Sequence, residues 1–358
     1  MSDAQLIQQW SPIIYHHQNE QYFPCSFPWL MLYSTLIDYN TPEPTIVSPI
    51  TSESLFNISR QYNFERHGDG DIIWSFSNEL YPGQHPTSNV PIYAISKRVN
   101  QKLYITYFTL YAYNGDYNIL NIAKTGSHPC DLEHIMLEID PNTNTLLRVL
   151  FSSHTPKDGR WVDAKDIEFE NNKVVAYAAL YGHGLYPKQG MIIRLLGLAN
   201  DYTSKDIRWE PKVEIAYHFG DPKFNASTMG WLLYYGRMGG SIKRGDTSGI
   251  MGLADKNWIR DMDSLDEQDY NPPTILSKKV GNIILIILQI IGIVLLYVSV
   301  LKLFQFSAKY FPKLVYNPKS SVQVKYLKIH TLTIALFIIC FNLFRWFVIY
   351  LTNTLVKN

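Results

Sequence analysis

Cysteine is scarce in this chain, and the positive and negative charges nearly cancel. The three cysteines are Cys25, Cys130 and Cys340, too few for a disulfide framework. Only a pair between Cys25 and Cys130 is conceivable, because Cys340 lies in a long apolar stretch, and the sequence leaves that pair open. The formal net charge of +1 at pH 7 differs from the strongly basic character of nucleic-acid-binding domains. We therefore expect no nucleic-acid partner.

Signatures of known enzyme classes are also absent from the sequence. It has no nucleophile elbow, no P-loop, no H-E-x-x-H zinc motif and no paired C-x-x-C. The first residues, MSDAQLIQQW, contain no basic stretch followed by an apolar one, which predicts that there is no cleavable signal peptide. Neither a catalytic reaction nor an export route follows directly from a motif.

Aromatic residues are abundant, with 25 Tyr, 17 Phe and 8 Trp. Aromatic and β-branched side chains favour pleated, half-buried surfaces. Residues 102–113 are apolar on both faces, as in a strand buried between two layers, and residues 134–140 lead into a Pro-Asn-Thr-Asn turn typical of a hairpin. Helices are predicted only near 2–10 and 28–36. We predict a mainly β fold, with a β-sandwich domain over residues 1–260.

Two long apolar stretches follow this domain. Val280–Leu301 has 22 residues and no charge, enough to cross the hydrocarbon core of a bilayer as a helix. A buried helix of a soluble protein is a weaker explanation at this length. Ile329–Leu351 is also long enough and carries Arg345 near its end, where the side chain can reach the interface. We predict a two-helix transmembrane hairpin that is entered through an acidic linker at 261–279, with the lipid bilayer as partner.

The loop between the two spans, residues 302–328, is basic. It contains no acid and six lysines, namely Lys302, Lys309, Lys313, Lys319, Lys325 and Lys328. Because basic loops face the cytosol, the β domain is predicted on the luminal or external side, where the sequons at Asn57 and Asn225 are usable. The missing signal peptide argues against export, so the orientation stays open. In either orientation we predict an integral, multi-pass membrane protein.

Candidate ligands for a divalent cation lie in the run GSHPCDLEHIMLEID, residues 126–140. Asp131 and Glu133 are two residues apart, so both carboxylates point to the same face of a strand. His128 precedes them by a short turn, and Asp116 lies in the turn after the preceding strand. An imidazole together with carboxylate oxygens favours Ca²⁺, Mg²⁺ or Mn²⁺. The sequence predicts a cation site formed by these four side chains.

Three further histidines are candidates for roles near this site. His134 points to the opposite face of the strand, where we expect it to pack or to hydrogen-bond. His154 or His183 would serve as general base if the site were a metal-assisted hydrolase, and the glycines beside His183 permit a tight loop. A purely structural role is the third interpretation, because buried polar groups require partners.

Four sequence blocks form a recognisable set. IIYHHQNEQYFPCSFPWL occupies Ile13–Leu30, and GSHPCDLEH follows a G-x-H-x-x-D-W-E-H pattern with Leu132 in place of the tryptophan. Phe151–Pro187 contains S-x-H, W-V-D-A and G-H-x-x-Y-P elements, and Met229–Gly240 contains a W-L-x-Y element. In this order the blocks resemble the vacuolar protein sorting-associated protein 62 family and its relatives among plant proteins of unknown function. The resemblance covers roughly residues 10–255 and leaves out the predicted hairpin.

This family resemblance implies a role in protein delivery to the vacuole and no established catalytic reaction. More remotely, the His-x-x-Asp-x-Glu kernel is similar to that of the necrosis-inducing cytolysins. Those proteins are β-sandwiches that bind a divalent cation and recognise sphingolipid head groups. The second resemblance implies that His128, Asp131 and Glu133 bind the cation, with Asp116 as a fourth ligand.

Together, these observations predict a membrane-anchored, cation-dependent binding module in membrane or vacuolar protein trafficking. The expected location is an endomembrane or the vacuolar membrane. A lipid head group, a glycan or a trafficking protein is the expected partner. The alternative is the metal-assisted hydrolase that uses the same histidine and carboxylates.

Overall fold

The computed structural model describes residues 1–302 apart from 40–42, 62–71, 86–88, 120–122, 154–155, 195–199, 241–248, 261, 263–269, 278 and scattered positions between 282 and 300. Contacts divide the chain into two compact units. The first unit comprises Met1–Asp116, Ser127–Ile192 and Asp201–Ile275. The second comprises Tyr117–Gly126, Ile193–Asn200 and Leu276–Asn358.

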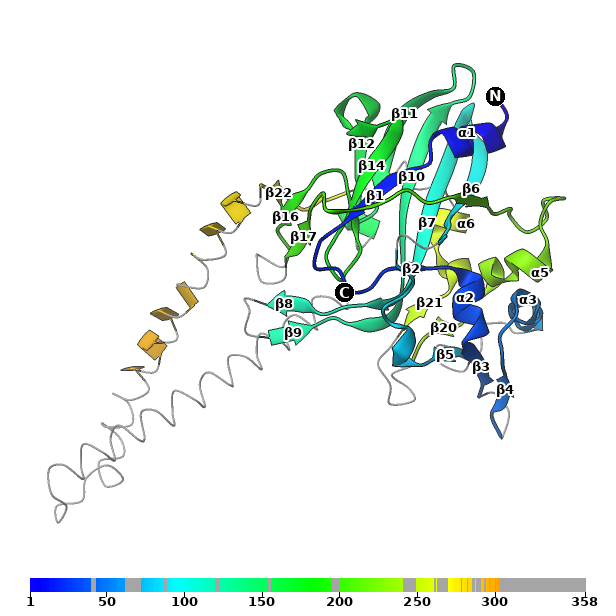
Figure 1. Ribbon diagram of the computed structural model, residues 1–358, viewed down its shortest axis with the longest axis horizontal. Coiled ribbons are helices and arrows are strands. Elements are labelled where there is room, and N and C mark those ends of the chain that lie inside the picture. The colour runs from blue at the N-terminus through cyan, green and yellow to red at the C-terminus, as the bar shows by residue number, and fades with distance from the viewer. Residues whose placement is uncertain are drawn as a thin grey trace, which may run out of the picture. The chain divides into compact units, whose positions relative to one another are not determined.

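A seven-stranded sheet is the centre of the first unit. Its strand order is β12-β11-β10-β7-β6-β19, with β2 paired to β7. The two long strands β7 and β10 lie in its middle (Figure 1). The bounds are β2 (Pro24–Cys25), β6 (Ile92–Val99), β7 (Lys102–Asn114), β10 (His128–Asp140), β11 (Thr145–Phe151), β12 (Arg160–Asp163) and β19 (Val213–Ile215).

A five-stranded sheet faces one side of this central sheet. Its order is β13-β14-β1-β18, with β15 paired to β14. The bounds are β1 (Ile13–His16), β13 (Phe169–Glu170), β14 (Lys173–Ala178), β15 (Leu185–Tyr186) and β18 (Ile207–Trp209). One apolar core joins the two sheets, and it includes Ile14, Ile105, Ile135, Val174 and Trp209. Facing sheets that share such a core form a sandwich arrangement.

The other side of the central sheet is covered as well. A second core joins its even-numbered β7 and β10 residues, such as Phe108 and Met136, to a third sheet with the order β21-β20-β5-β3-β4 and to short helices. The bounds are β3 (Ser34–Asp38), β4 (Thr45–Val47), β5 (Ile72–Phe76), β20 (Arg237–Met238), β21 (Ile250–Met251), α2 (Phe27–Leu32), α3 (Ser52–Gln61), α5 (Ala226–Met229), η5 (Gly230–Leu233), η7 (Leu253–Asp255) and α6 (Asn257–Arg260).

Burial of β7 and β10 on both faces agrees with the sequence pattern. Alternate residues of a strand point to opposite faces, so a strand between two cores is expected to carry apolar residues on both faces. The mainly β fold is thereby confirmed, and so is the hairpin in which β11 follows β10 with Asp140 opposite Thr145. The architecture is richer than the predicted two-layer sandwich, because the third sheet adds a layer.

The remaining described elements are short. Within the first unit they are α1 (Asp3–Gln9), η1 (Asn78–Leu80), η2 (Pro156–Asp158), η3 (Ala164–Asp166), and the paired strands β16 (Gly190–Ile192) and β17 (Asp201–Thr203). The second unit contains the hairpin of β8 (Tyr117–Ile119) and β9 (Ala123–Thr125). Strand β22 spans Ile275–Leu276.

The two predicted helices differ in accuracy. The N-terminal helix was predicted correctly. In the structure, Ser2 and Gln5 form a capping box at the start of α1. The second helix starts one residue earlier than predicted and ends at Leu32, where β3 begins soon after. Its β-branched continuation, Ser34–Asp38, pairs with β5 instead.

The structure describes only part of the C-terminal region in which the transmembrane hairpin is predicted. In the portion that the structure describes, no helix combines the length and the apolar character needed to cross a membrane. The first predicted span, Val280–Leu301, is described only at some positions, and the second, Ile329–Leu351, lies outside the described residues. The transmembrane hairpin therefore stays a prediction.

The two cysteines of the first unit are free and buried. Cys25 lies on β2 and Cys130 on β10, and both face the core that holds the third sheet. Burial raises the pKa of both thiols. A disulfide between them, which the sequence left open, is not formed.

Candidate functional site: a buried histidine between two carboxylates

His183 is held in a tight loop between β14 and β15. Tyr181 and His183 both have left-handed backbone conformations, with φ of 65° and 54°. The loop is closed by two hydrogen bonds, from the His183 amide to the Ala179 carbonyl at 2.9 Å and from the Ala179 amide to the Gly184 carbonyl at 2.9 Å. The loop directs the imidazole towards the central sheet.

The imidazole of His183 contacts two carboxylates and is fully buried. Its Nδ1 lies 3.2 Å from Oδ2 of Asp131 on β10. Its Nε2 lies 3.0 Å from the Tyr22 carbonyl oxygen and 3.7 Å from Oε1 of Glu20. The ring also stacks on Tyr111 of β7, with 3.7 Å between ring centroids and 6° between planes.

These contacts favour the protonated ring. Burial alone lowers the pKa of His183, but hydrogen bonds and charges from Asp131 and Glu20 outweigh burial and raise it to about 9. In the protonated ring both nitrogens donate, one to a carboxylate and one to a carbonyl. The stacked tyrosine adds a cation–π contact. At neutral pH the site is an imidazolium between two carboxylates.

Glu20 ties the chain after β1 to the His183 loop. Its Oε1 accepts hydrogen bonds from the amides of Gln21 and Tyr22, each at 2.9 Å, and its Oε2 accepts one from the Tyr181 amide at 2.8 Å. Burial raises the pKa of Glu20, but its interaction with His183 outweighs burial, so the pKa lies below its usual value. A charged Glu20 therefore joins two segments that are far apart in the sequence.

A second buried histidine lies beside the first. Nε2 of His16 on β1 is 3.0 Å from the Tyr111 hydroxyl. Burial lowers the pKa of His16 to about 4, and the nearby charge of His183 acts in the same direction, although Glu20 opposes it. Two histidines close together thus hold opposite protonation states, because only His183 has carboxylates at hydrogen-bonding distance.

Asp131 and Glu133 share one face of β10, as predicted. They lie opposite Tyr111 and Thr109 of β7 in the sheet register. Oδ1 of Asp131 accepts a hydrogen bond from the Leu132 amide at 3.0 Å. Oε2 of Glu133 accepts one from the Ser152 hydroxyl at 3.3 Å. Both acids are largely buried and are engaged with protein groups.

The predicted cation ligands are not gathered around one point. Nδ1 of His128 lies 2.8 Å from the Cys130 carbonyl oxygen, within its own strand, where Cys130 has a left-handed φ of 57°. No group of three His, Cys, Asp or Glu side chains in the described ranges, which include Asp116, His128, Asp131 and Glu133, is arranged to hold a metal ion.

The chemistry of the site gives the reason. A metal bound to Asp131 would place positive charge next to the imidazolium of His183, which already neutralises this carboxylate. An ion at Asp131 would therefore compete with His183 for the carboxylate. Ion binding itself stays a prediction, and nothing below depends on it.

The other candidate histidines have separate environments. His134 lies on the opposite face of β10, as predicted, and stacks on Trp258 with 4.3 Å between ring centroids. Burial lowers the pKa of His134 to about 3. His154 lies outside the described residues. Only His183 joins the predicted carboxylates, and it does so through Asp131.

Sequence reasoning missed three members of the cluster: His16, Glu20 and Tyr111. The run HHQNE, which begins at the last residue of β1, could have indicated two of them, His16 and Glu20. It places a histidine and an acid at the end of an apolar strand. Tyr111 could not be distinguished from the other tyrosines of β7. Its role depends on the partner that stacks on it.

A match to a known protein family covers part of the first unit and a small part of the second. Residues 104–242 match the vacuolar protein sorting-associated protein 62 family. This confirms the resemblance that the motifs indicated. The matched region includes Tyr111, Asp131 and His183 of the buried cluster, and also Glu133. No curated protein matches the chain.

Solved structures with a similar trace include proteins of the necrosis-inducing type. NLPPya in complex with glucosamine is 9% identical, with a TM-score of 0.38, over 75% of this chain and 90% of that chain. Necrosis and Ethylene inducing Protein 2, from the causal agent of cocoa's Witches Broom disease, is 13% identical, with a TM-score of 0.31, over 60% of this chain and 74% of that chain. At these values neither protein carries a function over to this chain.

Proposed function

We propose that this chain is a membrane-attached binding module in protein sorting to the vacuole. The match of residues 104–242 to the vacuolar protein sorting-associated protein 62 family carries this proposal. That match spans the long strands of the central sheet and the His183 loop. The conclusion concerns a binding role, because the buried site offers no group that is free to catalyse.

The geometry of His183 favours binding over hydrolysis. A general base needs a nitrogen that accepts a proton from water. Both nitrogens of His183 are engaged, one by Asp131 and one by the Tyr22 carbonyl, and the ring has no exposed surface. Since its preferred state is protonated, His183 has no lone pair to offer. The metal-assisted hydrolase is therefore the weaker alternative.

Membrane attachment is supported by the surface of the first predicted span. Large apolar side chains are exposed along it, namely Val280, Ile283, Ile287, Ile291, Val294, Leu295, Tyr297, Val298 and Leu301. Exposed apolar surface of this extent marks a protein or membrane interaction site. A bilayer would cover it, and the stretch is long enough for that partner.

The sorting role is tested in cells from which the gene has been deleted. We expect these cells to secrete a soluble vacuolar protease that wild-type cells retain. Expression of the full chain is expected to restore retention, and a chain that ends before Val280 is expected not to. Normal delivery of the protease in the deletion strain would contradict the proposal.

The orientation of the β domain is tested by glycosylation. Asn57 and Asn225 are exposed in the described structure and lie in N-x-S sequons. If the basic loop faces the cytosol, we expect the chain to migrate faster after glycosidase treatment, and the shift to disappear in Asn57→Gln together with Asn225→Gln. An unshifted wild-type chain whose β domain is digested by protease added to the cytosolic face would contradict this orientation.

A further inference from the structure

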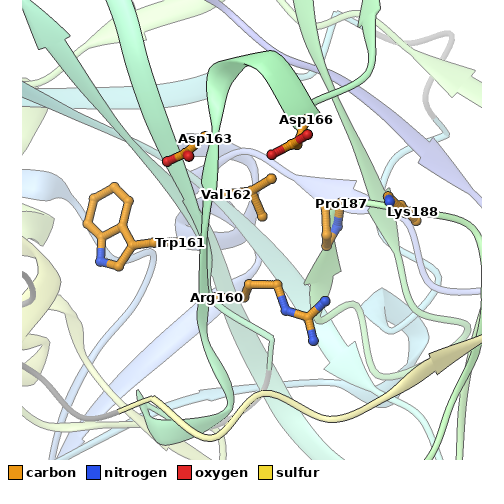
Figure 2. A pocket seen from close by; sticks show the side chains of 7 residues that line it. All are labelled: Arg160, Trp161, Val162, Asp163, Asp166, Pro187 and Lys188. Carbon is orange, nitrogen blue, oxygen red and sulfur yellow. The ribbon is translucent and has the colours of Figure 1, made fainter.

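A small pocket lies at the edge of the central sheet. It opens between β12, η3 and the Pro187–Lys188 step that follows β15, and its volume is about 270 Å³. Figure 2 shows Arg160 and Val162 on one side of β12 and Trp161 and Asp163 on the other. Since about 30 Å³ is the share of one water molecule in the liquid, the pocket suits a small organic ligand.

Four charged side chains line the pocket, and one of them, Asp163, lies 3.9 Å from the Lys165 ammonium. In the part of the chain that is described, neither the Lys188 ammonium nor the Asp166 carboxylate has a hydrogen bond or ion-pair partner. One Nη of Arg160 donates to the Pro273 carbonyl oxygen at 3.1 Å, which orients the guanidinium and leaves its other N–H groups available. The pocket therefore presents two cations, Arg160 and Lys188, and two carboxylates, Asp163 and Asp166, around an apolar floor of Val162 and Pro187.

The walls of the pocket are held in place by the fold. Arg160 and Val162 are paired with Phe151 and Val149 of β11. On the opposite wall, the Lys188 carbonyl accepts a hydrogen bond from the Thr203 hydroxyl at 3.0 Å. The segment that leads to this wall begins in the His183 loop. A pocket whose walls are already ordered loses little entropy when it binds a ligand.

We infer that this pocket binds a small zwitterion that carries a phosphate and a primary ammonium. Arg160 and Lys188 supply the two positive charges that a phosphate monoester matches, and the fork of Arg160 suits phosphate oxygens. Asp166 accepts hydrogen bonds from the ammonium. A free phosphorylated amine and the head group of an aminophospholipid share this chemistry. The inference goes beyond the sorting role, which would stand even if the pocket bound no such ligand.

Calorimetric titration of the full-length chain with O-phosphoethanolamine tests the inference. We expect Lys188→Gln to weaken binding roughly ten-fold, as for loss of a charge-assisted hydrogen bond. Asp166→Asn is expected to weaken the binding of phosphoethanolamine by a similar factor and to leave the binding of inorganic phosphate unchanged. The matched control is Lys157→Gln, because Lys157 lies in the short helix η2 just before β12, is exposed and does not line the pocket. It is expected to change affinity less than two-fold.

Each outcome decides the matter. Equal affinity for inorganic phosphate and phosphoethanolamine would overturn the zwitterion assignment, as would an unchanged affinity of Asp166→Asn. Binding that the Lys157 control weakens as much as Lys188→Gln would indicate non-specific attraction and would also overturn it. Vesicles that contain phosphatidylethanolamine or only phosphatidylcholine distinguish the two sources. Stronger, Lys188-dependent binding to the first identifies a lipid head group, and binding of free phosphoethanolamine alone identifies a soluble ligand.

Discussion

Replacement of His183 by alanine is expected to lower the free energy of unfolding by about 3–5 kcal/mol, the usual effect of removing one partner of a buried charge pair. The substitution removes the positive charge that lies between the buried carboxylates of Glu20 and Asp131, and it removes the ring that stacks on Tyr111. The measurement is denaturant unfolding of the full chain at neutral pH, followed by tryptophan fluorescence.

The control for this experiment is His128→Ala. His128 begins β10, the strand that carries Asp131, is only partly buried, and contacts the backbone carbonyl of Cys130. Its substitution is expected to cost less than about 1 kcal/mol. A second variant, His183→Gln with Asp131→Asn, is expected to cost less than the sum of the two single changes, because the neutral amides relieve the unpaired charge. Equal losses for His183→Ala and His128→Ala would show that the buried charge cluster contributes little.

The free energy of unfolding is expected to reach its maximum near pH 6.5, with losses on both sides. On the acid side, His16 and His134 have folded-state pKa values of about 4 and about 3, each lowered mainly by burial. The unfolded chain binds protons at these histidines from about pH 6.5 downwards, whereas the folded chain does not. Stability is therefore lost as the pH falls below 6.5, by roughly 3 kcal/mol for His16 by pH 4.

The alkaline side has the opposite sign because of His183. Its folded-state pKa of about 9 lies above the value of an unperturbed histidine. The stability that it contributes is fully present below about pH 6.5 and is lost as the pH rises through 9. Glu20, whose pKa is lowered, adds a loss only below its unfolded value of 4.5. Chemical unfolding at a series of pH values measures both limbs.

Substitution separates the two limbs. His134→Phe keeps a ring against Trp258 and removes one titrating group, so we expect a shallower acid limb and an unchanged alkaline limb. His183→Gln is expected to flatten the alkaline limb. If the acid limb of His134→Phe were as steep as that of the wild type, the assignment of this limb to buried neutral histidines would be wrong.

Part of the candidate site could be predicted from local sequence. The spacing of Asp131 and Glu133 places their carboxylates on one face, because the side-chain period of a strand is two residues. The same argument placed His134 on the other face. The partners of these acids could not be predicted, since Ser152 and His183 come from other segments of the chain.

The predicted cation site shows how far local sequence alone can predict a site. Three residues of the types that bind metals lie within six positions, which suggested that their side chains converge on one point. The face of the strand on which a side chain lies does not by itself fix which group it contacts. The imidazole that reaches Asp131 is that of His183, which is 52 residues away in the sequence, and not that of His128. A distant loop therefore supplies a partner for Asp131 that the local pattern could not reveal.

By itself the sequence determined the mainly β character, the strands buried on both faces, the N-terminal helix, and the family resemblance. These features follow from periodicity and motif order, which act over a few residues. Only the tertiary structure decided the third layer, the charge state of each histidine and the assembly of the pocket. Those properties depend on which distant segments meet, and burial changes the free energy of a charge far more than any neighbour in the sequence does.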